Sequence, residues 1–129
     1  MIPLVLRATA ANPLKIFGTD WDTKDGTCIR DYVHVVDLIE AHILALGALK
    51  PHVHEIVNLG SGGGYSVREV ISVATKVLGR EVPAIESPRR AGDPGTLVAS
   101  IVKAKSLLGW QPTRDLEKMI SDTVKSQVR

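Results

Sequence analysis

The sequence predicts an α/β domain in which helices dominate and the strands are few and short. One observation is a complete helix-capping box, Ser66-Val67-Arg68-Glu69, followed by apolar residues at helical spacing that end at Gly79. A second is a set of short apolar runs between turn residues, such as Leu14–Phe17, which are typical of strands. The third is a length of 129 residues, 44% of them hydrophobic, which suffices for one core. We therefore expect a single domain over residues 1–129.

The N-terminal segments alternate between a helix, a strand and a loop. A short helix with proline in its first turn is expected within residues 2–11. It ends at Asn12-Pro13, because the residue before a proline disfavours the helical conformation. Leu14–Phe17 then predicts a strand, and residues 19–26, which hold three aspartates and a glycine, predict a polar loop.

A segment dense in polar groups follows at residues 26–37. Within it, Ile29–Val35 is expected to be extended. Asp37 and Glu40 have the spacing of a capping box, so we expect Asp37 to cap a helix that runs to about Leu49. This helix is apolar nearly all round, which indicates burial on more than one side.

The remaining half of the chain predicts two strands and three helices. Each helix begins near a capping or turn signal and carries apolar residues at helical spacing. The expected strands are Glu55–Gly60 and Pro83–Glu86, and the expected helices run from Ser66 to Gly79, from Ile101 to Leu108, and onward from Asp115.

Composition excludes several classes of function. The formal charge is only +2 and aromatic residues make up 4% of the chain, so we expect no nucleic-acid partner. No apolar run is long enough to span a bilayer, so we expect no membrane partner. A single cysteine, Cys28, excludes an internal disulfide and a cysteine-based zinc site. These features suit a cytoplasmic location.

The glycine-rich stretch Gly60–Gly64 lies between an expected strand and a helix, which is the layout of a dinucleotide-binding turn. However, Tyr65 stands where the third glycine of that motif belongs, and its side chain would keep helix and strand apart. No acidic residue follows in a suitable place to hold a ribose. A structural turn is therefore the favoured interpretation.

Metal binding and nucleophilic catalysis have little support. The four histidines lie on different elements or in an exposed turn, and no metal-binding histidine motif occurs. Cys28 lies at the opposite end of an extended segment from His34, so we expect a buried thiol with no catalytic role. We expect neither a catalytic residue nor a metal ligand in this chain.

Arginines remain as candidates for anion binding. Arg30 follows the polar loop, and the Arg89-Arg90 pair lies in a turn-rich segment with Asp93. The arginine fork matches phosphate oxygens, so Arg30 and this pair can clamp a pyrophosphate, and Asp93 can accept from a ribose hydroxyl. Composition alone leaves surface salt bridges as the alternative.

Several blocks of this sequence together form a recognisable pattern. They are Ile16–Gly18, the run Gly26-Thr27-Cys28-Ile29-Arg30-Asp31-Tyr32-Val33-His34, Asn58–Val67, Arg89-Arg90-x-Gly92-Asp93-Pro94 and Leu108-Gly109-Trp110-x-Pro112. The pattern resembles the C-terminal portion of the UDP-glucose 4-epimerases, isomerases of galactose metabolism in the extended short-chain dehydrogenase/reductase family. The resemblance covers essentially the whole chain and implies the helix-rich substrate-binding part of that fold.

The resemblance also implies a binding site for a UDP-sugar, with each role carried by a matching residue. Two arginines would contact the diphosphate, an aromatic ring would lie against the uracil and a carboxylate would hold the ribose. In this sequence the roles fall to Arg30 and Arg90 for the diphosphate, Phe17 for the uracil, Asp93 for the ribose, Tyr32 near the nucleotide and Leu97 facing the sugar.

The catalytic half of such an enzyme has no match here. The family places an NAD-binding turn and a Tyr-x-x-x-Lys motif in its N-terminal domain. Val36 follows Tyr32 by four residues and Glu69 follows Tyr65 by four, so neither tyrosine forms the motif. We therefore expect a truncated chain, inactive alone, that binds a UDP-sugar weakly and lacks the NAD of the parent enzyme. The NAD-binding and catalytic parts would come from another chain or be absent. The alternative is an interaction module that forms homo-oligomers through apolar surface.

Overall fold

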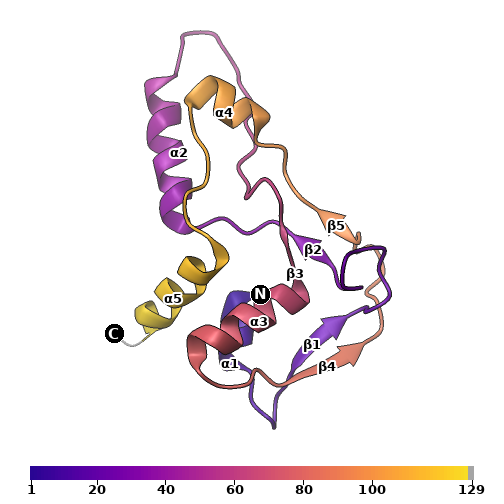
Figure 1. The fold of residues 1–129 in the computed structure, drawn as a ribbon. Helices are drawn as coiled ribbons and strands as arrows, with labels where there is room; N and C mark the ends of the chain where they lie inside the picture. Colours follow the sequence, from indigo (N-terminus) through magenta and orange to yellow (C-terminus); the bar gives the residue numbers. More distant parts are fainter. Residues whose placement is uncertain (128–129) are drawn as a thin grey trace.

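The computed structural model describes residues 1–127, so the last two residues of the predicted domain, 128–129, lie outside the described range. Helices gather on one side of the molecule and two small sheets on the other (Figure 1). This confirms the predicted helix-rich α/β fold with few short strands. In chain order the elements are α1 (Ile2–Arg7), β1 (Leu14–Phe17), β2 (Ile29–Arg30), α2 (Val35–Gly47), β3 (Tyr65–Ser66), α3 (Val67–Leu78), β4 (Ala84–Ser87), β5 (Thr96–Leu97), α4 (Val102–Leu108) and α5 (Leu116–Gln127).

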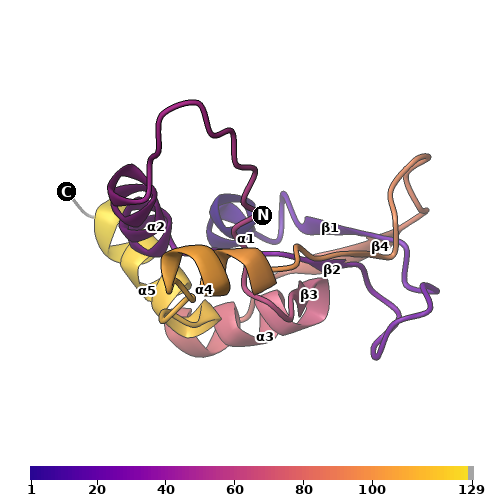
Figure 2. The same cartoon turned by 90° about the horizontal axis from the view of Figure 1, so that it is seen from above.

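The strands form two small sheets that lie side by side in both ribbon views (Figures 1 and 2). In the first, β1 pairs with β4 in parallel, with Phe17 opposite Ser87. In the second, β2 is central, antiparallel to β3 and parallel to β5. The central position of β2 places Arg30 between two neighbouring strands.

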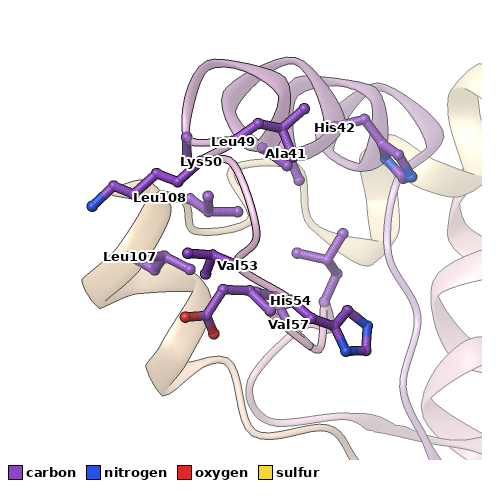
Figure 3. A pocket seen from close by; sticks show the side chains of 13 residues that line it. Ala41, His42, Leu49, Lys50, Val53, His54, Val57, Leu107 and Leu108 are labelled. Atoms are coloured by element: carbon purple, nitrogen blue, oxygen red, sulfur yellow. The ribbon is translucent and has the colours of Figure 1, made fainter.

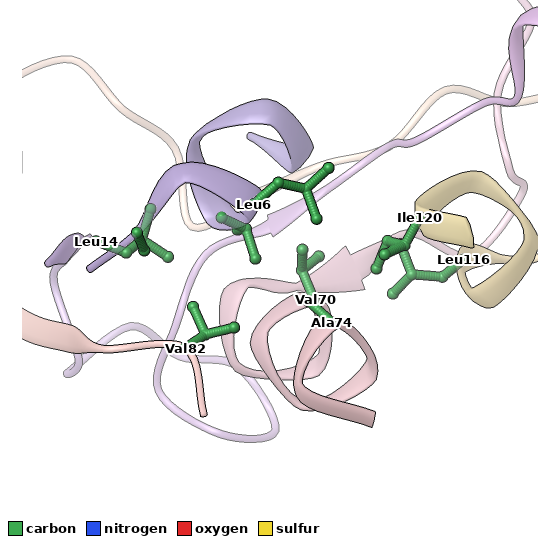
Figure 4. Packing of buried hydrophobic residues seen from close by; sticks show 9 residues of the cluster. Leu6, Leu14, Val70, Ala74, Val82, Leu116 and Ile120 are labelled. Atoms are coloured by element: carbon green, nitrogen blue, oxygen red, sulfur yellow. The ribbon is translucent and has the colours of Figure 1, made fainter. Parts of the chain in front are cut away.

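The main core lies where α3 packs against α1, α5 and the start of β1 (Figure 4). On α3 and α5 the buried members are four residues apart, Val70 with Ala74 and Leu116 with Ile120, so each of these helices turns one apolar stripe inward. Ile120 and Val70 are completely buried. The buried members of this cluster are Val5, Leu6, Ala8, Leu14, Val70, Ala74, Val82, Leu116 and Ile120.

The predicted capping box of α3 is confirmed. The backbone N–H of Glu69 donates to the Ser66 hydroxyl oxygen over 3.1 Å, and the Glu69 carboxylate accepts from the Ser66 N–H over 2.8 Å. Gly79 ends the helix in the left-handed conformation with φ +63°. The Ser66 hydroxyl also donates to Asp25, which ties the polar loop after β1 to the start of α3.

The prediction that Asp37 caps α2 is wrong. The helix begins earlier, at Val35, and the ring of His34 is the cap, with Nδ1 accepting from the Val36 N–H over 3.1 Å. Asp37 lies in the first turn and is completely buried. Its carboxylate accepts from the Arg114 guanidinium and from the Thr113 hydroxyl, so this acid joins α2 to the segment before α5.

Two expected extended segments form less strand than predicted. Of Ile29–Val35, only Ile29–Arg30 pairs as a strand, and Glu55–Gly60 is not a strand in this structure. A strand requires a neighbour to accept and donate its backbone hydrogen bonds, and none of the described strands pairs with the latter segment. The first helix also ends four residues early, at Arg7. No helix in the described part combines the length and apolarity needed to cross a bilayer.

Candidate functional site

Three of the predicted site residues form one cluster at the end of β1. Phe17 is the last residue of that strand, and the Arg90 guanidinium carbon lies 4.5 Å from the centre of its ring. The same guanidinium forms an ion pair with Asp93, with Nε at 3.0 Å and Nη2 at 2.9 Å from Oδ2. An arginine over an aromatic face and beside a carboxylate is held by cation–π and charge-assisted contacts.

Arg30 lies on β2 and is half-buried. Its Nη1 donates to the carbonyl oxygens of Ile29, over 2.9 Å, and of Gly95, over 3.4 Å. Within residues 1–127, no carboxylate forms an ion pair with Arg30. Two carbonyl dipoles balance a full positive charge only in part, so the guanidinium retains capacity for an anion.

The segment from Asp93 to Leu97 joins Arg30 to the Phe17 cluster. Leu97 lies opposite Arg30 in the parallel register of β2 and β5, and the Ile29 N–H donates to the Gly95 carbonyl over 2.8 Å. Residues directly opposite each other in a sheet point to the same face. The structure therefore places Arg30 and Leu97 on one face, a few residues along the chain from Asp93.

Tyr32 occupies a different environment. Its ring packs against the main core and lies 6.3 Å from the ring of Tyr65, centre to centre. It lines a hollow of about 350 Å³ between α1 and α5, together with His34 and Met119. Burial raises the pKa of Tyr32, and the nearby charge of Arg30 offsets part of this effect. Within the described residues, Tyr32 therefore packs with the main core and not with the Phe17 cluster.

Asp31 is a structural residue that the sequence did not single out. Its carboxylate accepts from the backbone N–H of Ser61 over 2.5 Å and from that of Ala99 over 2.9 Å. It thereby joins the glycine-rich loop to the segment after β5. The only signal in the sequence was an acid directly after Arg30, and acids beside arginines are common on any protein surface.

The glycine-rich loop is a structural turn that does not fit a dinucleotide. A Cβ atom on Gly60 would lie 2.1 Å from the Asp31 carboxylate, and Gly64 has φ +72° with Ile29 and Val98 close by. The donors that a pyrophosphate needs are already engaged, since the Ser61 N–H bonds to Asp31 and the start of α3 is capped by its own box. This loop therefore lacks the free backbone donors that would hold the pyrophosphate of NAD.

The neighbouring arginines Arg89 and Arg90 lie on different aromatic rings. The Arg89 guanidinium carbon lies 4.0 Å from the centre of the Trp21 ring, and its Nε donates to the Asp20 carboxylate over 2.7 Å. Arg90 alone reaches Phe17. Sequence reasoning treated the two arginines as one pair and did not consider Trp21. An isolated aromatic residue in a polar loop was the available signal.

The other reactive side chains have structural surroundings. Cys28 is buried beside Ile16 and Val67, with Sγ 4.0 Å from the Phe17 carbonyl oxygen. His34 is buried as the cap of α2, with Nε2 3.3 Å from Asp122. Among the described residues, no group of three or more His, Cys, Asp and Glu side chains has an arrangement that could hold a metal ion.

A second hollow lies far from the arginines, between α2, α4 and the irregular segment that joins α2 to β3 (Figure 3). Its volume is about 480 Å³ and most of its wall is apolar. Ala41 and Leu49 of α2, Val53 and Val57 of the joining segment, and Leu108 of α4 contribute to it. Polar groups are confined to a few side chains, among them His42, His54, Lys50 and Glu55.

Comparison with known proteins places these features in a family context. The family described as GDP-mannose 4,6 dehydratase matches residues 9–123. A UDP-glucose 4-epimerase of Corynebacterium glutamicum is 50% identical over 125 residues, covering 95% of this chain and 38% of the relative. One from Lacticaseibacillus casei is 49% identical over 124 residues, covering 93% and 38%. The chain thus spans about 38% of the length of these curated relatives.

A solved structure supports the same relationship. UDP-glucose 4-epimerase from Bifidobacterium longum, in complex with NAD+ and UDP, superposes with a TM-score of 0.87 and 34% sequence identity. The superposition covers 98% of this chain and 37% of that one. The fold described above is therefore that of a segment of the epimerases.

Proposed function

Because the chain belongs to the family of GDP-mannose 4,6 dehydratase, with UDP-glucose 4-epimerases among its relatives, we propose that residues 1–129 form the C-terminal, UDP-sugar-binding part of such an epimerase. The single observation that supports this most is the gathering of Phe17, Arg90 and Asp93 in one cluster, joined through Gly95 to Arg30. Phe17 and Arg30 are far in sequence from the segment 90–95, so their contacts with this segment follow only from the fold.

The proposed roles follow from the chemistry of each group. Arg30 and Arg90 bind the diphosphate, because each guanidinium presents parallel N–H donors to phosphate oxygens. Phe17 offers an aromatic face to the uracil, and the Asp93 carboxylate accepts from ribose hydroxyls. Leu97, exposed beside Arg30, faces the sugar. Tyr32, two residues after Arg30 in the chain, acts near the nucleotide.

The ion pair between Arg90 and Asp93 does not prevent this binding. The Arg90 side chain is 61% exposed, and an exposed ion pair contributes at most about 1 kcal/mol. A diphosphate, which as a whole carries more negative charge than one carboxylate, can therefore draw the Arg90 fork away from Asp93 at small cost. Arg30 has no ion pair to break within the described residues, so it is the stronger anchor.

Turnover requires groups beyond these residues. NAD would take a hydride from the sugar and return it to the opposite face, and its binding turn and the Tyr-x-x-x-Lys motif belong to the other part of such an enzyme. We therefore propose that the chain by itself binds a UDP-sugar weakly and does not epimerise it. An assay with UDP-galactose and added NAD should show no conversion, and turnover by the chain alone would contradict this.

Calorimetric titration with UDP tests the binding site. The chain should release heat at millimolar UDP, and Arg30→Ala or Arg90→Ala should abolish it. Arg7→Ala is the matched control, since Arg7 is exposed on α1, away from the proposed site. Absence of heat from the unchanged chain at millimolar UDP would refute the proposal.

A second proposal, self-association, is favoured by the surface of α2. Ile39, Ile43, Leu46 and Leu49 are between 53% and 73% exposed on or directly after this helix, and Leu49 also lines the apolar hollow. Exposed apolar area of this kind is commonly covered by another protein surface. Light scattering at rising concentration should show an oligomer, and Ile43→Glu should dissociate it. A monomer at high concentration would contradict this second proposal.

A further inference from the structure

We propose that Arg89, Asp20 and Trp21 form a latch that positions Phe17 and Arg90 for the nucleotide diphosphate. This inference rests on the proposed function, because it concerns the same UDP site. In it Arg89 is a positioning residue, since its guanidinium is committed to Trp21 and Asp20 and reaches no proposed ligand position.

The latch joins two segments that are distant in sequence. Arg89 Nε donates to the Asp20 carboxylate over 2.7 Å, and Nη2 donates to the Asp20 carbonyl oxygen. Its guanidinium also covers one face of the Trp21 ring at 4.0 Å. A planar fork that bonds twice to one residue while stacking on the next requires arginine, because a lysine ammonium has no plane to stack on the ring and all its donors share one nitrogen.

Trp21 is in turn held directly against the end of β1. Its indole N–H donates to the Phe17 carbonyl oxygen over 3.2 Å. A Cβ atom on Gly18, which has φ +81°, would lie 2.4 Å from the indole nitrogen and 2.7 Å from Arg89 Cγ. Only glycine at this position lets the Trp21–Arg89 stack approach the chain so closely, so the latch bears directly on the residue after Phe17.

The same tryptophan contacts the segment that serves Arg30. A Cβ atom on Gly95 would lie 3.1 Å from the Trp21 ring, and the Gly95 carbonyl accepts from Arg30 Nη1. Arg90 follows Arg89 directly in the chain and lies over the Phe17 ring. Holding Arg89 on Trp21 therefore restricts the positions that Arg90 can take beside Phe17.

The latch contributes to binding more than to stability. Its ion pair is exposed, with 42% of the Arg89 side chain and 74% of the Asp20 side chain accessible to solvent. Loss of this ion pair should therefore change the free energy of unfolding only slightly. A site whose residues are ordered before the ligand arrives loses less entropy on binding. Removal of the latch should therefore lower UDP affinity while leaving the urea midpoint of unfolding nearly unchanged.

Calorimetry and NMR on the 129-residue chain test this. Arg89→Ala should weaken UDP binding about tenfold, and Arg89→Lys should weaken it nearly as much because the charge without the fork does not form the latch. Only two indole N–H signals exist, from Trp21 and Trp110. In both variants the Trp21 signal should shift and that of buried Trp110 should not. Arg68→Ala, which loses a similarly exposed ion pair with Glu86, is the control and should keep full affinity.

A double-mutant cycle separates positioning from direct charge. Arg90→Lys keeps a positive charge and therefore a measurable affinity but loses the planar fork, so it serves as the second variant of the cycle. If Arg89 acts through the Arg90 fork, its removal should have little further effect in the Arg90→Lys background. Additive losses, or full affinity in Arg89→Lys, would show that only charge matters and overturn the latch. Unchanged affinity in Arg89→Ala with a shifted Trp21 signal would also overturn it while the proposed UDP site stands. Absence of UDP binding by the unchanged chain would overturn both.

Discussion

Arg30 on β2 lies directly opposite Leu97 on β5, in a parallel register that also places Ile29 opposite Thr96. Leu97 is 60% exposed, so the face that it shares with Arg30 is open to solvent. The pairing brings a positive charge from the first quarter of the chain beside an apolar side chain from its last third. It is the closest structural link between the proposed phosphate anchor and the proposed sugar contact.

An acid at position 97 should compete with phosphate for Arg30. In Leu97→Asp, the new carboxylate lies on the same sheet face as the guanidinium, so we expect about tenfold weaker UDP binding, measured by calorimetry. Stability should change little because Leu97 is exposed. Leu4→Asp makes the same change at a 63% exposed position on α1 and should leave affinity unaltered. Equal affinity in both variants would contradict the role assigned to this face.

The glycine-rich loop provides a matched pair of substitutions. Gly64 has φ +72°, and an added Cβ atom would lie 2.6 Å from Val98 and 2.7 Å from Ile29. Gly64→Ala should therefore lower the unfolding free energy by about 2 kcal/mol, measured by urea denaturation. Gly63 has open space around it, so Gly63→Ala should be close to neutral. Similar losses of unfolding free energy in the two variants would show that the effect comes from chain flexibility and not from close packing at Gly64.

Asp37 and Glu40 share one arginine but differ in burial. Both carboxylates pair with Arg114, yet Asp37 is completely buried whereas 45% of the Glu40 side chain is exposed. Asp37→Ala should cost about 3 kcal/mol of unfolding free energy, because it leaves Arg114 and the Thr113 hydroxyl without their buried partner. Glu40→Ala should cost less than about 1 kcal/mol. Urea denaturation measures both, and comparable costs would contradict this assignment.

Asp37 should also make the free energy of unfolding depend on pH in the acid range. Burial alone would raise the pKa of Asp37, but hydrogen bonds from Arg114 and Thr113 outweigh it and hold the pKa below its ordinary value of 3.8. The unfolded chain then binds the proton more readily, so this contribution is complete above about pH 4 and is lost as pH falls through the folded pKa.

Urea denaturation at pH 5 and pH 3 tests the sign of this effect. The unfolding free energy should be lower at pH 3. The pKa values of Asp25 and Glu69 are also lowered, since their hydrogen bonds and nearby charges outweigh the effect of burial. These two acids therefore contribute in the same direction. Asp37→Asn should reduce the difference between the unfolding free energies at pH 5 and pH 3. The same difference in this variant as in the unchanged chain would contradict a role for Asp37.

Local patterns predicted several elements correctly because the signals act within a few residues. The strand Leu14–Phe17, the capping box at Ser66 and the end of α3 at Gly79 were all predicted in this way. The start of α2 was not predicted correctly. Asp37 has the right spacing for a cap, but the Arg114 side chain offers its carboxylate a stronger partner, and His34 caps the helix in its place. That partner comes from the far end of the chain.

By itself, the sequence determined the helix-rich fold class and the residue types that suit a UDP-sugar site, because motifs and periodicity are written along the chain. Only the tertiary structure decided which residues meet. It separated Arg89 from Arg90 by stacking each on a different aromatic ring, and it packed Tyr32 against the helical core. It also placed the Asp31 carboxylate where it accepts hydrogen bonds from two separate loops, at Ser61 and Ala99. The physical reason is that such contacts depend on directions and distances between segments far apart in sequence, which no local spacing encodes.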